Sequence, residues 1–142
     1  GWLTPFAAAG FAFVAVGSNY LFQYVMAADR GNTLLSDRFD ALSVPFLRVL
    51  KQIVDAGRAS GTPVTLCGEL AGRPISAMAL LGLGYRSISM SPASIGPVKA
   101  MLTDLPLAKL EAFLADALSR PGAGRDMRAE LSAFADEHGV PL

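Results

Sequence analysis

The 142-residue chain lacks the features that mark several common classes of protein. It has one cysteine, Cys67, so no disulfide can form within it, and a lone cysteine is typical of a reducing compartment such as the cytoplasm. Twelve basic and twelve acidic residues cancel, so we expect no basic surface for nucleic acid or an anionic membrane. A zinc site of Cys and His ligands is excluded, because the sole histidine is His138.

Long hydrophobic runs are also missing. The most apolar stretch covers residues 6–16, well short of the roughly 20 residues that a membrane-spanning helix needs. No basic leader of the kind found in signal peptides precedes it. We therefore expect a buried strand with its lead-in here, and no membrane association. The chain is nevertheless 52% hydrophobic, which predicts either a generous core or an apolar surface that meets a partner.

Three apolar runs, each followed by a helical pattern, indicate strand–helix units. Continuous apolar runs are typical of strands that are buried on both faces of a parallel sheet. The alternation of strands and helices predicts an α/β fold with a parallel sheet. The expected strands are residues 11–16, 63–67 and 87–90, and the helices after them are 21–28, 74–83 and one that carries Ile95, Val98, Met101 and Leu102.

The clearest helix lies between Ser43, a good N-cap residue, and Gly61. Its apolar residues recur at three-to-four spacing and form one stripe. Two further amphipathic helices are predicted at about 108–118 and 127–138, the second capped by Asp126 and ended by Gly139. The stripe consists of Phe46, Leu47, Leu50, Ile53, Val54 and Gly57.

Candidate functional residues follow the predicted strands, where α/β folds bind their ligands. Cys67 is either a thiol that handles a proton or a small buried hydrophobe. Catalysis by a cysteine–histidine pair is not expected, because His138 lies far along the chain and reads as a solvated residue. Arg30 could hold a phosphate or carboxylate, or pair with a surface aspartate. Asn19 could bind a phosphate oxygen or stabilise a turn.

The amino-acid sequences of these loops resemble those of one family. VGSNYLFQ with ADRGN, then PVTLCGELAG, then SISMSPASI follow the order and spacing of Enzyme I, the phosphoenolpyruvate (PEP)–protein phosphotransferase. The likeness covers about residues 13–101, with a weaker fit to the end. The segment RSISMSPASIGPVKAML is similar to the nitrogen-related branch of that family. Pyruvate phosphate dikinase and PEP synthase share the barrel and the cysteine, but they do not usually pair DRGN with CGELAG.

The resemblance implies a cytoplasmic, homodimeric transferase whose (β/α)8 barrel binds PEP and Mg²⁺. The phosphoryl group would pass to a histidine of a separate domain, then to an HPr-like carrier protein. Asn19 and Arg30 would hold the phosphate, and Cys67 would protonate the pyruvate enolate. A full barrel needs roughly 250 residues. Residues 1–120 are therefore expected to be its C-terminal portion, about three βα units, and 121–142 a C-terminal helix packing on it.

The sequence also departs from the family pattern. Tyr20 occupies the position of an aspartate that binds Mg²⁺ in the family, and a neutral phenol is a poor ligand for a hard cation. The second metal-binding glutamate, the arginines of earlier strands and the phosphoryl-accepting histidine have no match, so we do not expect this chain alone to catalyse. The alternative is a non-catalytic dimerisation or regulatory module of a degenerate paralogue, since three strands leave two sheet edges that seek partners.

Overall fold

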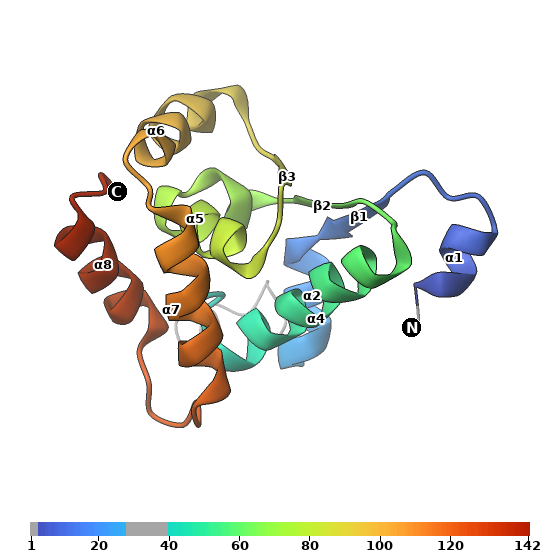
Figure 1. Cartoon of the computed structure of the whole chain (residues 1–142), viewed down its shortest axis with the longest axis horizontal. Coiled ribbons are helices and arrows are strands. Elements are labelled where there is room, and N and C mark those ends of the chain that lie inside the picture. The colour runs from blue at the N-terminus through green and yellow to red at the C-terminus, as the bar shows by residue number, and fades with distance from the viewer. Residues whose placement is uncertain (1–2, 28–39) are drawn as a thin grey trace.

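The computed structural model describes residues 3–27 and 40–142. Within these ranges the chain forms a mixed α/β fold, with a small parallel sheet flanked by helices (Figure 1). The elements are α1 (Thr4–Ala8), β1 (Val14–Gly17), α2 (Ser18–Met26), α4 (Val44–Ser60), β2 (Val64–Cys67), the 3₁₀ helix η1 (Glu69–Gly72), α5 (Pro74–Leu83), β3 (Ser87–Ser89), α6 (Pro92–Thr103), α7 (Leu107–Ser119) and α8 (Met127–His138).

The predicted parallel sheet is confirmed, with strand order β1-β2-β3. The first strand begins at Val14, however, and the expectation that residues 11–16 form a buried strand is wrong at its start. Phe11 and Phe13 are 57% and 59% exposed. Pairing begins where the Val14 N–H donates to the carbonyl of Pro63, because β2 itself starts only at Val64.

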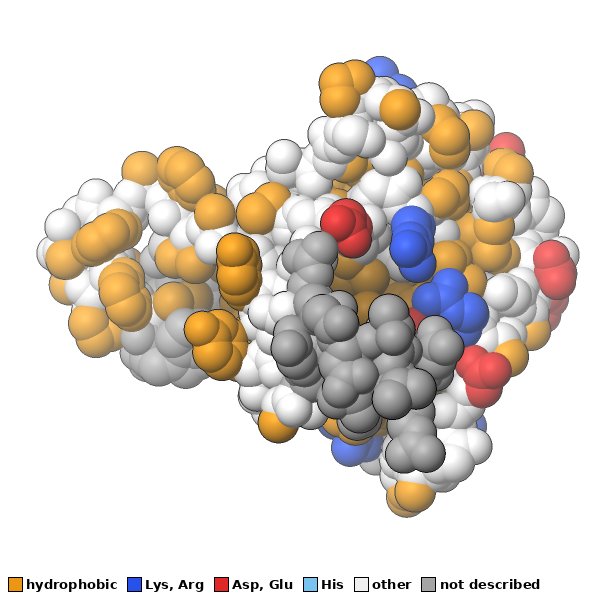
Figure 2. Space-filling view, turned by 180° about the vertical axis from the view of Figure 1, so that it is seen from behind, with side chains coloured by type: hydrophobic (Ala, Val, Ile, Leu, Met, Phe, Trp, Pro, Cys, Tyr) orange, Lys and Arg blue, Asp and Glu red, His pale blue; other side chains and the backbone are white. Residues whose placement is uncertain are grey.

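The segment before β1 was not predicted to be helical, yet it contains α1. Pro5 lies in the first turn of this short helix, where its fixed φ is favourable. The rings of Phe6 and Phe11 then meet edge to face with their centroids 5.7 Å apart. Figure 2 shows hydrophobic side chains gathered over residues 3–13, the N-terminal arm, which forms the lobe at the left of the view. The arm therefore exposes apolar surface, as the composition allowed.

Helix α4 supplies much of the core, and every residue of its predicted stripe is buried. Gly61 ends it with a left-handed φ of 69°. Ser43 occupies the N-cap position as predicted, but its hydroxyl makes no capping bond and has no hydrogen-bond partner in the described part of the chain. A serine cap bonds the N–H of the second or third helical residue, and Pro45 removes the first of these donors.

Helix α5 runs over 74–83 as predicted and lies at the centre of the fold, in contact with α4, α6, α7 and α8 (Figure 1). Close approach to α7 requires glycine at position 82, where a β-carbon would lie 2.5 Å from Cδ1 of Leu114. Just beyond α5, the buried Tyr85 donates a hydrogen bond from its hydroxyl to the carbonyl of Leu50, 2.9 Å away. Burial, with a smaller contribution from the charge of Asp55, raises the pKa of Tyr85.

Helix α6 confirms only half of its predicted apolar stripe. Val98 and Met101 are buried, whereas Ile95 and Leu102 are 43% and 42% exposed. The described elements that contact α6, chiefly α5 and η1, cover one side of it. The other side is therefore exposed in this chain.

The C-terminal helix α8 spans 127–138 as predicted. The carboxylate of Asp126 accepts the capping hydrogen bond from the N–H of Ala129, and Gly139 ends the helix at φ 66°. The expectation of a solvated His138 is wrong. Its ring is half-buried, stacks on Phe134 with centroids 4.3 Å apart, and places Nδ1 2.9 Å from that residue's carbonyl oxygen.

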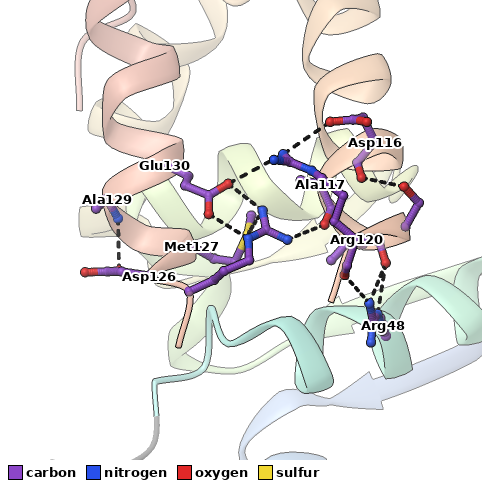
Figure 3. A network of polar contacts seen from close by, with 11 residues as sticks. Arg48, Asp116, Ala117, Arg120, Asp126, Met127, Ala129 and Glu130 are labelled. Atoms are coloured by element: carbon purple, nitrogen blue, oxygen red, sulfur yellow. Dashed lines mark hydrogen bonds and ion pairs between the residues drawn. The ribbon is translucent and has the colours of Figure 1, made fainter. Parts of the chain in front are cut away.

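Two arginines form hydrogen bonds with carbonyl groups at the end of α7 (Figure 3). Arg48 of α4 donates to the carbonyls of Leu118 and Arg120, and Arg125 donates to the carbonyl of Ala117 and to Glu130. The last carbonyls of a helix have no partner within the helix, so these guanidinium groups satisfy them. The hydrogen bond from Arg125, followed in size by the opposing effect of burial, leaves the pKa of Glu130 below its ordinary value.

A further ion pair joins α8 to the segment before α4. Arg128 donates from Nε and Nη2 to the two carboxylate oxygens of Asp40, each at 2.8 Å. Burial alone would raise the pKa of Asp40. The bonds from Arg128 and from the N–H of Leu42, together with nearby positive charge, outweigh it and hold the pKa below its ordinary value.

Replacing Gly82 should test the α5–α7 contact. In Gly82→Ala the added methyl group meets Leu114 at 2.5 Å and Leu110 at 2.7 Å, so we expect the free energy of unfolding to fall by about 1–3 kcal/mol in urea denaturation. Gly96→Ala in α6 is the matched control, because no atom lies within 4 Å of the new β-carbon. It should gain about 0.5–1 kcal/mol from helix propensity. Similar changes in both variants would contradict the contact.

Replacing Arg128 should give a pH-dependent loss of stability. Both side chains of the pair are more than one-third exposed, so Arg128→Gln should lower the free energy of unfolding by at most about 1 kcal/mol at pH 7. The folded-state pKa of Asp40 is depressed, so the pair stabilises the fold above the unfolded pKa and this contribution is lost as the pH falls through the folded pKa. Urea titrations over that range should show the two proteins converging, and a constant difference would disprove the linkage.

Candidate functional site

The register of the sheet brings three loops to one level. Gly17 pairs with Cys67, and Cys67 pairs with Ser89, so the carboxyl ends of β1, β2 and β3 are aligned. Polar residues lie within two positions of each end, at Ser18, Glu69 and Ser91, as the sequence predicted. Since the strands are parallel, these residues share the edge of the sheet where α/β proteins bind ligands.

Helix α2 starts immediately after β1, with Ser18 and Asn19 in its first turn. It has no side-chain cap and no acidic residue in that turn. Its first N–H groups therefore have no helical acceptor, and a helix terminus of this kind favours an anion. Asn19 is half-buried and lies in a helix, which disfavours the alternative that it only stabilises a turn.

Cys67 is half-buried at the end of β2, and its thiol donates a hydrogen bond to the carbonyl of Val16, with Sγ 3.5 Å from the oxygen. The next residue, Gly68, has a φ of 118° that other residues rarely adopt. A β-carbon there would lie 2.3 Å from Oγ of Ser18 and 3.5 Å from Oδ1 of Asn19. The loop after Cys67 (residues 68–72), called the cysteine loop below, thus passes against the first turn of α2. Asn19 and Cys67 lie at neighbouring strand ends.

Ser18 was not predicted from the sequence. It is only 2% exposed, and its hydroxyl has no hydrogen-bond partner among residues 3–27 and 40–142. A buried hydroxyl without any partner costs about 1–3 kcal/mol, so the Ser18 hydroxyl is available to a water or a ligand. The available signal was its position between Gly17, which ends the first strand, and the candidate residue Asn19.

Arg30 and Tyr20 are the other two residues that the sequence singled out. Arg30 lies outside the described residues. Tyr20, next to Asn19, is 70% exposed. In the part of the chain that the structure describes, no group of three His, Cys, Asp or Glu side chains could hold a metal ion. Tyr20 itself does not fit a Mg²⁺ site, because a phenol contributes no charged oxygen to one.

A cleft of about 530 Å³ opens between the loop after β2 and the loop after β3, and Gly68 is among its lining residues. Arg73, its cationic residue, occupies the N-cap position of α5 and was not identified from the sequence. The signal for it was local, since an arginine is an unusual choice at a helix start. The lining consists of Gly68, Glu69, Gly72, Arg73, Ser89, Met90, Ser91 and Ser94.

No helix in the described ranges is long and apolar enough to cross a membrane.

Comparison with known proteins identifies relatives of this chain. The model of the family described as PEP-utilising enzyme, PEP-binding domain, matches residues 3–106. A phosphoenolpyruvate-protein phosphotransferase of Borreliella burgdorferi is 40% identical over 99 residues, which is 70% of this chain and 17% of the relative.

Other relatives agree. A phosphoenolpyruvate-protein phosphotransferase of Bacillus sp. is 42% identical over 100 residues, covering 70% of this chain and 17% of its own length. A protein of Salmonella typhimurium named phosphoenolpyruvate-dependent phosphotransferase system is 33% identical over 139 residues, covering 98% of this chain and 18% of its own. The chain spans less than a fifth of each of these relatives. It belongs to the family of PEP-binding domains of PEP-utilising enzymes.

Proposed function

We propose that this chain supplies part of the substrate site of a PEP–protein phosphotransferase of the Enzyme I type. In the parent protein the phosphoryl group of PEP would pass to a histidine outside this chain, and then to an HPr-like carrier. The observation that carries the proposal is the meeting of two strand ends. There Gly68, which follows Cys67, lies against the first turn of α2, which contains Asn19. Family membership supports the choice of substrate.

Phosphoryl transfer depends mainly on positioning and on neutralising charge. The first turn of α2 offers unpaired N–H groups, and the Asn19 amide can donate from Nδ2 to a phosphate oxygen. Arg30 would add a guanidinium that binds two oxygens at once. Ser18 adds a hydroxyl that no described residue uses. Together these groups would fix the phosphate of PEP beside the end of β2.

Loss of the phosphoryl group leaves an enolate, which becomes pyruvate when its methylene carbon gains a proton. We assign that proton to the thiol of Cys67, which is free and half-buried at the end of β2. The S–H bond breaks, a C–H bond forms with the enolate electron pair, and the thiolate is reprotonated by water. In the structure the thiol hydrogen is directed to the Val16 carbonyl, so the step requires at least a rotation about the Cβ–Sγ bond.

Three finer assignments accompany this function. The sequence of residues 86–102 supports assignment to the nitrogen-related branch of the family. The outer edge of β1, preceded by the exposed Phe11 and Phe13, is suited to packing against further strands of a (β/α)8 barrel in the parent. The exposed apolar surface also suits a homodimer, and the absence of long apolar helices in the described ranges suits a cytoplasmic enzyme.

The second candidate is a non-catalytic dimerisation or regulatory module of a degenerate paralogue. The exposed Tyr20 favours it, since this residue stands where a Mg²⁺ ligand is expected. Both candidates share the fold and differ in whether the parent protein forms phosphohistidine. The exchange of Tyr20 described below decides between them.

Removing the thiol should slow turnover. In the full-length parent, Cys67→Ala should lower the rate of pyruvate formation from PEP by about 10²-fold or more, because a positioned acid contributes about 10²–10⁴-fold. Thr65→Ala is the control, because Thr65 lies two residues earlier on the same strand and bonds to Ser87 at a distance from the strand ends. Pyruvate release is followed with a coupled assay. Full turnover in Cys67→Ala would remove the proton-donor role.

Restoring a carboxylate at position 20 should strengthen the response to Mg²⁺. The full-length parent is incubated with labelled PEP and the carrier, and phosphohistidine is measured against Mg²⁺ concentration. Tyr20→Asp should reach half-maximal labelling at about tenfold lower Mg²⁺, since a hard cation prefers charged oxygen ligands. Tyr24→Asp, one turn further along α2 and 83% exposed, should not. No label in any version would refute the enzymatic function and favour the regulatory module.

A further inference from the structure

The cleft between the second and third strand ends is distinct from the Asn19–Cys67 pair. Its wall contains Gly68 but neither Asn19 nor Cys67, whose thiol is turned towards β1. Gly72 keeps its two sides together, because a β-carbon there would lie 2.7 Å from Oγ of Ser94. At about 530 Å³ the cleft has the size of a small-ligand site. Its chemistry indicates which ligand it would take.

Arg73 brings a positive charge to this cleft. It forms no ion pair with any residue that the structure describes, whereas Arg48, Arg125 and Arg128 all bond to carboxylates or carbonyls. Its charge reaches Asp40, but that carboxylate is already bound by Arg128. A cation at a helix N-cap opposes the helix dipole, and a local conflict of this kind is typical of functional sites.

Two helices also direct their positive ends to the same cleft. Helix α5 begins after Arg73 and α6 begins after Ser91, and both of these residues line the cleft. Neither helix has a side-chain cap or an acidic residue in its first turn, and the Ser91 hydroxyl instead bonds to that of Ser94 at 3.1 Å. Ser76, also in the first turn of α5, is fully buried with a hydroxyl that has no partner among the described residues, but it does not line the cleft.

We propose that this cleft binds a small oxyanion, the phosphate or carboxylate group of a metabolite, at a subsite separate from the strand ends that carry Asn19 and Cys67. Its oxygens would accept hydrogen bonds from the guanidinium of Arg73 and from the hydroxyls of Ser89, Ser91 and Ser94. Glu69 also lines the cleft and takes part in an interaction of its own. Its negative charge would weaken the affinity for an anion.

The test is a titration of the 142-residue chain with inorganic phosphate and, separately, with succinate, followed by amide NMR shifts at constant ionic strength. We expect saturable shifts at Gly68, Gly72, Ser91 and Ser94. Arg73→Gln should weaken binding about tenfold or more, as expected for loss of a charged hydrogen-bond donor. Arg58→Gln is the control, because Arg58 is exposed at the end of α4 that precedes β2, away from the carboxyl ends of the strands.

Glu69→Gln should act in the opposite direction and tighten binding. Saturation by phosphate alone identifies a phosphate ligand, and saturation by succinate a carboxylate ligand; either result supports the site. Shifts confined to residues 18–20, equal affinity in Arg73→Gln and the unaltered chain, or no saturable shift with either anion would overturn it. The measurement uses no PEP, so its failure is distinguishable from failure of the proposed phosphotransferase function.

Discussion

The in-register parallel pairing of β1, β2 and β3 is the constraint on which the arrangement of the site depends. It places Gly17, Cys67 and Ser89 at one level, so the loops that follow must meet at one edge. Side chains alternate between the faces of a strand, and a slip of one residue would turn Cys67 to the opposite face. The strands have only three or four residues, so their register is fixed by the helices packed on them rather than by their own length.

Gly68 converts that alignment into contact between loops. Its positive φ and the absence of a side chain allow the chain after Cys67 to pass against Ser18 and Asn19, and the same residue lines the cleft. Any larger residue would separate the first turn of α2 from the cysteine loop. One backbone position therefore sets the spacing of both the proposed substrate site and the proposed anion subsite.

The sequence predicted best those features that are determined locally. The bounds of α5 and α8, the buried stripe of α4 and the caps at Gly61, Asp126 and Gly139 follow from periodicity and backbone preference. It failed where burial depends on neighbours, as at Phe11, Phe13, Ile95 and Leu102. Among the residues of the proposed sites, Asn19 and Cys67 were named from their position after a strand and from resemblance, and their roles stay predictions. Ser18 and Arg73 were not named, because whether a hydroxyl or a charge has a partner among the described residues is visible only once the surrounding atoms are placed.

The charges at the strand ends explain what such a site requires. Among the described residues of the loops after β1, β2 and β3, Arg73 and Glu69 carry opposite formal charges and Tyr20 carries none, so side chains there give no net attraction for a multiply charged phosphate. The remaining attraction comes from the uncapped starts of α2, α5 and α6, whose partial charges act only over the first turn. Strong binding of PEP would therefore depend on cations supplied from elsewhere in the parent protein, or on Arg30. In the proposed site, the described part of this chain would orient a phosphorylated substrate more than neutralise it.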